Sequence, residues 1–351
     1  MRLLRPLSSR SLKRTLAAAT RTAVRAAAKA ITQALHIPKR AAAKKVLVKK
    51  PLRAPARKNP VLVSGIAGGL RYRLFVPADM RRGERLPLMV MLHGCTQDAQ
   101  ALATSTRMNQ LATRERFVVL YPEQDRLSNL QGCWNWFQTN TGKAQLEADA
   151  IVLAIDHICR TQAIDPERIA LAGLSAGAGM AALVATRHPQ RLRAVAMHSG
   201  IAPGLAHSTA SALGAMRGLH IAEPLAALAA DQHLPALLVI QGGSDPIVAP
   251  VNGAKAAQLW ATHEDATPGR PRTLQRGARY PVTVTDFFTR GRLVSTLCEI
   301  DGLGHAWSGG AASQAYSDPK GPDASRMIWA FAARQFALPA APGALPLRQA
   351  A

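Results

Sequence analysis

A serine flanked by glycines is the first group in this sequence that could perform chemistry. The segment Gly173-Leu174-Ser175-Ala176-Gly177 fits the pattern G-x-S-x-G, in which a nucleophilic serine occupies a sharp turn between a strand and a helix. The apolar run 169–172 predicts the strand, and the Ala-rich run after the motif predicts the helix. The glycines leave room for close backbone approach, and the helix N-terminus would face developing negative charge. The segment therefore predicts a nucleophile at Ser175, and simple turn packing is the alternative.

A serine hydroxyl becomes a good nucleophile only with a histidine to accept its proton and an acid to orient that histidine. In the strand–turn–helix setting these groups follow later strands in the order serine, acid, histidine. Asp245 follows the predicted strand 236–240, and His305 follows the predicted strand 293–300. We therefore expect Ser175, Asp245 and His305 to form a catalytic triad. A turn role is the alternative for Asp245, because Ser-Asp-Pro is a good turn sequence.

Two backbone N–H groups are needed to bind the oxyanion that forms when a serine attacks a carbonyl. One candidate is Ala176, directly after the nucleophile, and the other is Cys95, in the loop after the apolar strand 87–92. His93 lies close to Cys95 in the chain. Because His93 precedes the serine, we expect it to brace the oxyanion loop and not to act as the base.

Tryptophan residues near these motifs suggest a substrate pocket. Three tryptophans lie in predicted loops beside the motifs: Trp134, Trp136 and Trp307. We expect them to form the walls of an apolar acyl pocket, and burial in the core is the alternative.

The 4 cysteines are too few for a disulfide framework and form no C-x-x-C pair. No cysteine pair therefore indicates a zinc site, and no bound metal is expected.

The arrangement of apolar segments predicts one large domain. Strand-like and helix-like runs alternate, which favours an α/β fold with a mainly parallel central sheet flanked by helices. We expect helices over 100–115 and over the Ala-rich stretch 201–234, and a polar surface excursion over 263–280. No run of about 18 apolar residues occurs, so no membrane-spanning helix is expected. The predicted parts are a basic extension with a Pro-containing linker (1–60), a catalytic domain (61–337) and a loose C-terminal tail (338–351).

Positive charge is concentrated at the start of the chain. Residues 1–60 hold 17 of the 44 Lys and Arg residues and no acid. A helix over 12–36 would place most of its basic residues opposite an apolar arc, which suits an anionic membrane or the surface of a polymer granule. A solvated disordered arm and an organelle transit peptide are the alternatives. The extension lacks the apolar region of a secretory signal, and no specific nucleic acid is expected as a partner.

Several segments together resemble one known family, the esterase/polyhydroxybutyrate (PHB) depolymerase family. The matching segments are 93–97 (HGCTQ), 120–124 (LYPEQ), 133–137 (CWNWF), 172–177 (AGLSAG), 304–310 (GHAWSGG) and 316–323 (YSDPKGPD). The resemblance covers roughly residues 65–335 and implies an α/β-hydrolase fold. It also implies cofactor-independent cleavage of short-chain polyhydroxyalkanoate esters, with Ser175, Asp245 and His305 as the triad. By the same resemblance, Cys95 and Cys133 form a disulfide, and the protein is extracellular.

These observations favour a serine ester hydrolase that acts on 3-hydroxybutyrate esters through an acyl-enzyme. A carbohydrate esterase that removes acetyl or feruloyl groups is the alternative enzyme. A polyanion-binding or surface-binding protein, in which the basic extension carries the main function, is the alternative of another class. The compartment stays open between extracellular, intracellular and granule-associated.

Overall fold

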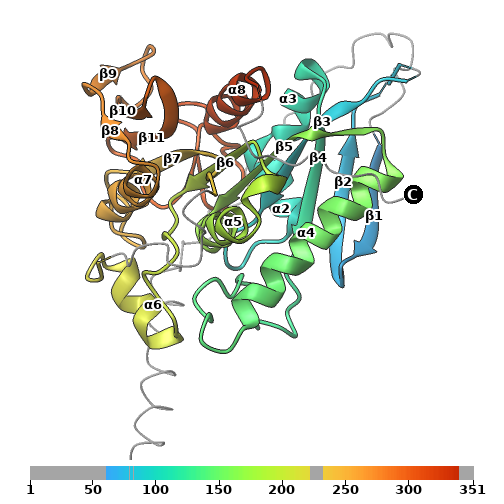
Figure 1. The fold of residues 1–351 in the computed structure, drawn as a ribbon, viewed down its shortest axis with the longest axis horizontal. Helices are drawn as coiled ribbons and strands as arrows, with labels where there is room; N and C mark the ends of the chain where they lie inside the picture. The colour runs from blue at the N-terminus through green and yellow to red at the C-terminus, as the bar shows by residue number, and fades with distance from the viewer. Residues whose placement is uncertain (1–60, 79, 82, 222–231, 340–351) are drawn as a thin grey trace, which may run out of the picture. The chain divides into compact units, whose positions relative to one another are not determined.

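The computed structural model describes residues 61–339, apart from Asp79, Arg82 and 222–231. The predicted extension 1–60 and most of the predicted C-terminal tail lie outside the described residues. Within them, eleven strands form a sheet in the order β1-β2-β4-β3-β5-β6-β7-β11-β10-β8, with β9 also paired to β10 (Figure 1). Its strands are β1 (Val61–Ala67), β2 (Leu70–Val76), β3 (Leu86–Leu92), β4 (Val118–Glu123), β5 (Ile164–Leu174), β6 (Ala194–His198), β7 (Ala236–Gly242), β8 (Thr267–Pro268), β9 (Arg272–Leu274), β10 (Val282–Thr289) and β11 (Arg292–Ile300).

The centre of the sheet is parallel. Strands β4, β3, β5, β6, β7 and β11 pair in parallel with their neighbours, whereas β1, β2 and β10 pair in antiparallel fashion toward the two edges. The central strands read as nearly continuous apolar runs, because both of their faces are covered. Parallel strands end at one common edge, so the loops after β3, β5, β7 and β11 gather there.

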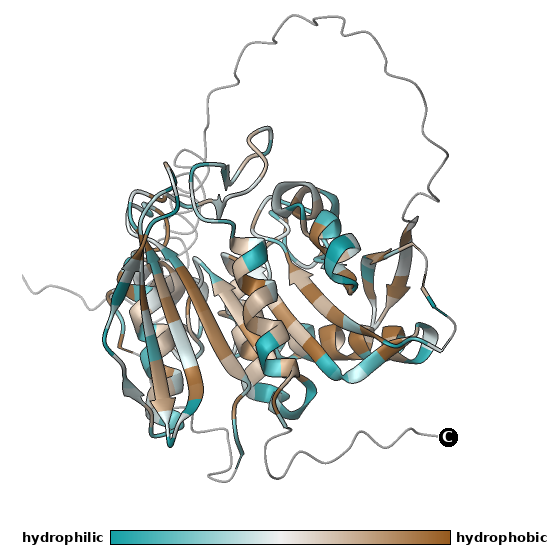
Figure 2. Cartoon of the chain, turned by 90° about the horizontal axis from the view of Figure 1, so that it is seen from above, coloured by the Kyte–Doolittle hydropathy of each residue, from teal (hydrophilic) through white to brown (hydrophobic). Residues whose placement is uncertain are grey.

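Helices cover both faces of the sheet (Figure 1). On β3, Val90 belongs to the core cluster that includes residues of α4, α5 and α7, whereas Met89 belongs to the cluster that includes residues of α2, α3 and α8. Figure 2 shows the hydrophobic residues concentrated on the strands and on the helix faces toward them. No helix in this described part of the chain is both long and apolar enough to cross a membrane. The helices are α2 (Ala99–Thr106), α3 (Met108–Glu115), α4 (Lys143–Thr161), α5 (Ala176–Arg187), α6 (Thr209–Met216), α7 (Val251–His263) and α8 (Ala324–Phe336).

The helix expected over 100–115 is two helices, α2 and α3, which corrects the prediction. They meet at Arg107, whose backbone is left-handed, with φ 53°. The Arg107 guanidinium donates hydrogen bonds to the carbonyl oxygens of Gly309 and Gly310, at 2.5 and 3.1 Å. The helix is therefore interrupted at the residue that bonds to a distant loop. Helix propensity, which depends on local sequence, cannot predict such a contact.

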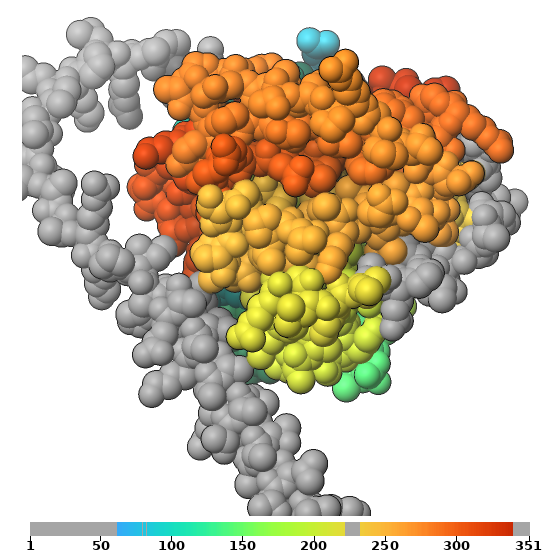
Figure 3. Space-filling model, turned by 90° about the vertical axis from the view of Figure 1, so that its left-hand side faces the viewer, coloured from blue at the N-terminus to red at the C-terminus, as the bar shows by residue number. Residues whose placement is uncertain are grey.

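The Ala-rich stretch 201–234 also differs from its prediction. The described residues 201–208 have no helix, and only α6 is helical before the undescribed 222–231. The side-chain amide of Asn252 on α7 donates to Ala215 O at 3.0 Å, and Figure 3 shows α6 (yellow) lying against the region of α7 (gold). The described residues 201–221 therefore contain one short helix, α6, which is hydrogen-bonded to α7. The predicted polar excursion over 263–280 is largely exposed, and it contributes the short edge strands β8 and β9.

Candidate active site

Ser175 occupies a strained corner between β5 and α5. Its φ of 56° and ψ of −119° fall outside the regions that a side chain favours, and such strain concentrates at functional sites. A Cβ at Gly173 would overlap the backbone of Gly177, and a Cβ at Gly177 would overlap Leu92 O on β3. The two glycines therefore allow β5, α5 and β3 to approach closely, and the corner lifts the serine clear of the sheet.

His305 connects the serine to an acid. Its Nε2 lies 3.0 Å from Ser175 Oγ, and its Nδ1 lies 2.8 Å from Asp245 Oδ2. These distances suit an imidazole that donates Nδ1–H to the carboxylate and accepts the serine proton at Nε2. The structure thus brings together the three residues named from the sequence, although 130 positions separate Ser175 from His305.

Asp245 is 5% exposed and uses its two oxygens for different tasks. Oδ1 accepts hydrogen bonds from the N–H groups of Ile247 and Val248, at 2.9 and 2.8 Å, while Oδ2 faces His305. Burial by itself raises the pKa of Asp245, but the hydrogen bond and charge of His305 and the two backbone donors outweigh it and hold the pKa below its usual value. The turn role and the triad geometry therefore coexist in one side chain.

The predicted oxyanion donors lie on either side of the serine. Ala176 is the first residue of α5, so its N–H has no acceptor within the helix. Cys95 follows Gly94, where a Cβ would lie 3.6 Å from Ser175 Cβ, so this loop passes directly beside Ser175. Neither N–H donates a hydrogen bond to another of the described residues. Both N–H groups are therefore available to an acceptor, as the prediction of an oxyanion site requires.

His93 contacts the loop that contains the predicted donor Cys95, in keeping with the bracing position expected for it. It is 1% exposed, its Nδ1 lies 2.9 Å from Gly94 O, and its Nε2 lies 3.1 Å from the N–H of Gln124. Burial lowers the pKa of His93 and keeps the imidazole neutral. A neutral imidazole that donates at Nδ1 and accepts at Nε2 satisfies both contacts.

A disulfide joins Cys95 to Cys133 and so connects the oxyanion loop to the tryptophan-containing loop. Asn135 continues that second loop and is fully buried. Its backbone N–H and its side-chain amide both donate to the Glu147 carboxylate of α4, at 2.8 and 2.5 Å. The tryptophan-containing loop is therefore fixed by one covalent bond and by one buried carboxylate. Cys159 and Cys298 are free thiols.

The three tryptophans do not behave alike. Trp134 and Trp307 are 0% exposed, so they are core aromatics and do not line an open pocket in this structure, which corrects the expectation for these two. Their rings pack against the buried imidazoles of His93 and His198, at centroid distances of 5.6 and 5.1 Å. Trp136 is half-buried and its ring lies over Gly179 of α5, one turn after Ser175. Only Trp136 keeps an exposed surface for a substrate.

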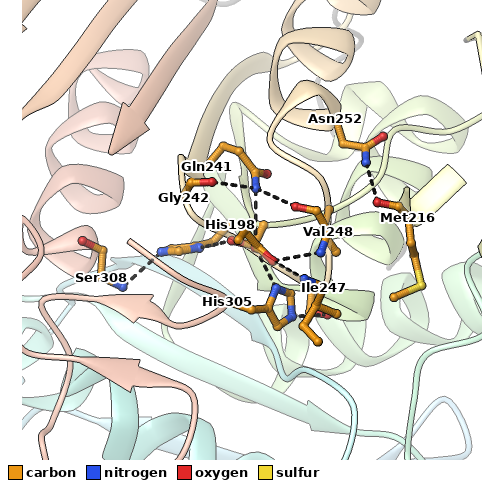
Figure 4. A network of polar contacts seen from close by, with 12 residues as sticks. His198, Met216, Gln241, Gly242, Ile247, Val248, Asn252, His305 and Ser308 are labelled. Carbon is orange, nitrogen blue, oxygen red and sulfur yellow. Dashed lines mark hydrogen bonds and ion pairs between the residues drawn. The ribbon is translucent and has the colours of Figure 1, made fainter. Parts of the chain in front are cut away.

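His198, at the end of β6, was not among the residues named from the sequence. Its backbone carbonyl accepts the N–H of Ser175 at 2.9 Å, and its Nε2 accepts the N–H of Ser308 at 3.1 Å. Figure 4 shows His198 between the loop of Ser308 and the residues around His305. Burial lowers the pKa of His198 to about 3, so the ring is neutral near pH 7. The only sequence signal was its place at the end of a central strand.

No group of three or more His, Cys, Asp or Glu side chains in the described part of the chain is arranged to hold a metal ion.

Comparison with known families agrees with this geometry. A sequence model of the family described as esterase PHB depolymerase matches residues 70–267, which is more than half of the 351 residues. The chain belongs to the esterase PHB depolymerase family. The family match includes Ser175 and Asp245, and His305 lies beyond it. The resemblance noted from the sequence segments is thereby confirmed.

Relatives within and around the esterase PHB depolymerase family carry different substrate names. A poly(3-hydroxyalkanoate) depolymerase C from Paucimonas lemoignei is 31% identical over 68% of this chain and 58% of its own length. A feruloyl esterase B from Thermothelomyces thermophilus is 28% identical over 41% of this chain and 48% of its own. A probable acetylxylan esterase A from Neosartorya fischeri is 25% identical over 43% and 40%. The chain thus spans roughly half of the length of these curated relatives.

A solved structure supports the fold. The acetyl xylan esterase from Aspergillus awamori superposes with a TM-score of 0.57 and 18% identity, over 70% of this chain and 94% of that one. At this identity the similarity concerns the fold alone. Together with the mixed sheet and its two helical layers, it confirms the α/β-hydrolase fold predicted for this member of the esterase PHB depolymerase family.

Proposed function

We propose that this protein is a carboxylic ester hydrolase with Ser175 as the nucleophile, His305 as the general base and acid, and Asp245 as the orienting acid. The observation that carries the proposal is the position of His305, within hydrogen-bond distance of both Ser175 Oγ and Asp245 Oδ2. Family membership supports the same chemistry. We also propose that residues 61–337 form the catalytic domain, because β1 begins at Val61 and α8 ends at Phe336.

The geometry supports a two-step reaction. Ser175 Oγ attacks the ester carbonyl carbon while His305 Nε2 takes the hydroxyl proton, and the N–H groups of Ala176 and Cys95 stabilise the oxyanion. Collapse of this intermediate breaks the bond to the alcohol oxygen, which receives the proton from His305. Water then attacks the acyl-enzyme, with His305 again taking and returning a proton. The carboxylic acid leaves, and the enzyme is restored.

For the substrate, we propose short-chain esters of 3-hydroxybutyrate, as oligomers or as amorphous polymer. Similarity to a poly(3-hydroxyalkanoate) depolymerase over 249 residues supports this choice. The alternative is an acetyl or feruloyl esterase acting on carbohydrate, favoured by relatives with those names at 25–28% identity. Surface attachment through the basic extension stays a prediction, because residues 1–60 lie outside the described part of the chain.

A comparative rate measurement tests the proposal. The value of kcat/KM is measured for 3-hydroxybutyrate oligomers, acetylated xylose oligomers and feruloylated sugars, with Ser175→Ala as the background control. We expect the highest value for the hydroxybutyrate oligomers and none above background for Ser175→Ala. A higher value for either sugar ester would make the carbohydrate esterase the correct assignment. Equal activity of wild type and Ser175→Ala would refute the triad.

A further inference from the structure

Two strained residues from distant parts of the chain meet through their hydroxyl groups beside the proposed active site. Thr96 and Tyr316 both have left-handed backbones, with φ 65° and 53°. For a β-branched residue such as threonine this conformation is unusual, and a glycine would adopt it without strain. The Oγ1 of Thr96 lies 3.4 Å from the hydroxyl oxygen of Tyr316, across 220 positions of sequence. Such strain at non-glycine residues points to a function for their side chains.

Both residues are fixed to the loops that carry the proposed chemistry. Thr96 directly follows Cys95, and its own N–H donates to Gln131 O at 2.8 Å. The carbonyl of Tyr316 accepts the N–H of Trp307 at 2.8 Å, two residues after His305. The hydroxyl pair therefore connects the oxyanion loop to the histidine loop. In the proposed mechanism His305 delivers its proton to the leaving alcohol. Tyr316 is hydrogen-bonded to the loop of His305, which favours the alcohol side of a bound ester for this hydroxyl pair.

The two hydroxyls are not committed to each other. Strong O–H···O hydrogen bonds are about 2.5–3.0 Å long, so the contact at 3.4 Å is weak. Thr96 is exposed and Tyr316 is half-buried, which leaves both within reach of a ligand. Each hydroxyl has one proton to donate, and neither carries a formal charge. Two convergent neutral donors fit the two lone pairs of a carbonyl oxygen.

We propose that Thr96 and Tyr316 form a subsite for a carbonyl oxygen in the alcohol part of the substrate. This inference rests on the proposed 3-hydroxybutyrate function. In a polyester of hydroxy acids, the leaving alcohol carries the carbonyl of the next unit a few bonds from the scissile oxygen. In an acetylated or feruloylated sugar, that position holds ring hydroxyls instead. The subsite therefore selects polyester chains through the unit that follows the cleaved bond.

Two substrates with one acyl group test the subsite. One is methyl 3-hydroxybutyrate, whose leaving group is methanol. The other is the methyl ester of the 3-hydroxybutyrate dimer, whose internal cleavage releases methyl 3-hydroxybutyrate and is followed by chromatography of that product. The readout is the ratio of kcat/KM for the dimer to kcat/KM for the monomer. Since the acyl group is shared, the ratio reports only on the alcohol side.

Loss of either hydroxyl should lower this ratio. We expect Tyr316→Phe and Thr96→Ala each to lower it roughly two- to tenfold, the range for one neutral hydrogen bond. Thr96→Ser keeps a hydroxyl and should keep most of the ratio. Tyr72→Phe is the matched control, because Tyr72 lies on β2, next to the edge strand of the sheet and away from both loops. Thermal unfolding of each variant verifies that it is folded.

The other possible results would contradict either the subsite or the proposed substrate class. An unchanged ratio in both Tyr316→Phe and Thr96→Ala, or an equal loss on both substrates, would overturn the subsite and leave the proposed function standing. Wild-type protein that hydrolyses acetylated xylose but neither hydroxybutyrate ester would overturn the proposed substrate class, and the subsite with it. The wild-type measurement alone separates these two failures.

Discussion

The neutral, buried imidazole of His198 should make the stability of this protein sensitive to acid. The folded pKa is about 3, against an ordinary value of 6.5 for an exposed histidine. Between these pH values the unfolded chain binds more protons than the folded one, so the free energy of unfolding falls as the pH falls. Above pH 6.5 the His198 imidazole is neutral in both the folded and the unfolded protein, so its full contribution to the free energy of unfolding is present there. Each pH unit below that removes about 1.4 kcal/mol, which gives ~2 kcal/mol at pH 5 and ~5 kcal/mol at pH 3.

The variant His198→Gln removes this titration. Its side-chain oxygen can accept the N–H of Ser308 in place of Nε2, so the loop contact is retained. Urea unfolding at pH 7.5 and pH 5 gives the free energy lost on acidification for each protein. Wild type should lose about 2 kcal/mol more than the variant over this interval. The buried His93 contributes in the same direction to both proteins, so it cancels in the difference. Equal losses in wild type and variant would refute the neutral state of His198.

Other predictions concern the proposed triad and its supporting loops. Ser175→Ala should remove ester hydrolysis by about 10⁶-fold while leaving the melting temperature near wild type, and a residual rate of one tenth would rule out Ser175 as the nucleophile. Asp245→Asn should lower kcat by roughly 10⁴-fold, because it misorients His305, and a change below tenfold would contradict that role. Cys133→Ser opens a link across 38 positions and should lower the free energy of unfolding by ~4 kcal/mol in urea titrations. Cys159→Ser is its control because Cys159 is a free thiol, and equal losses in the two variants would argue against the link.

The sequence contained strong local signals for the fold and for the strand–turn–helix corner at Ser175. The central strands are apolar runs. Gly173 and Gly177 are needed because a side chain at either position would overlap neighbouring backbone, a steric requirement common to such strand–turn–helix corners. That Asp245 and His305 would lie near Ser175 was predictable, because chain order and the ends of parallel strands restrict which side chains can meet there. Helical structure over 100–115 was predictable, but the break at Arg107 was not, because the hydrogen bonds of Arg107 go to a loop 202 and 203 positions away.

The orientation of loop side chains also could not be predicted from the sequence. A tryptophan beside a motif can face the substrate or the core, and the choice depends on which elements pack over it. Trp134 turns inward against His93, whereas Trp136, two residues later, keeps exposed surface. Likewise, nothing local to His198 indicates its hydrogen bond to Ser308, which is 110 positions away. Such contacts arise only when the sheet brings distant strand ends together.

Residues His198 and Ser199 at the end of β6 help to fix the relative positions of the three proposed triad residues, which follow three different strands. His198 O accepts the N–H of Ser175 from the loop after β5, and the N–H of Ser199 donates to Ile240 O on β7, both at 2.9 Å. The ring of His198 holds Ser308 of the short strand β12 (Trp307–Ser308), which follows β11. One dipeptide therefore contacts chain segments next to all three proposed triad members. Ser199 is left-handed, with φ 52°, and is fully buried. Because packing and neutral hydrogen bonds hold this dipeptide, the distances of His305 to Ser175 and to Asp245 depend on the interior of the protein more than on its exposed loops.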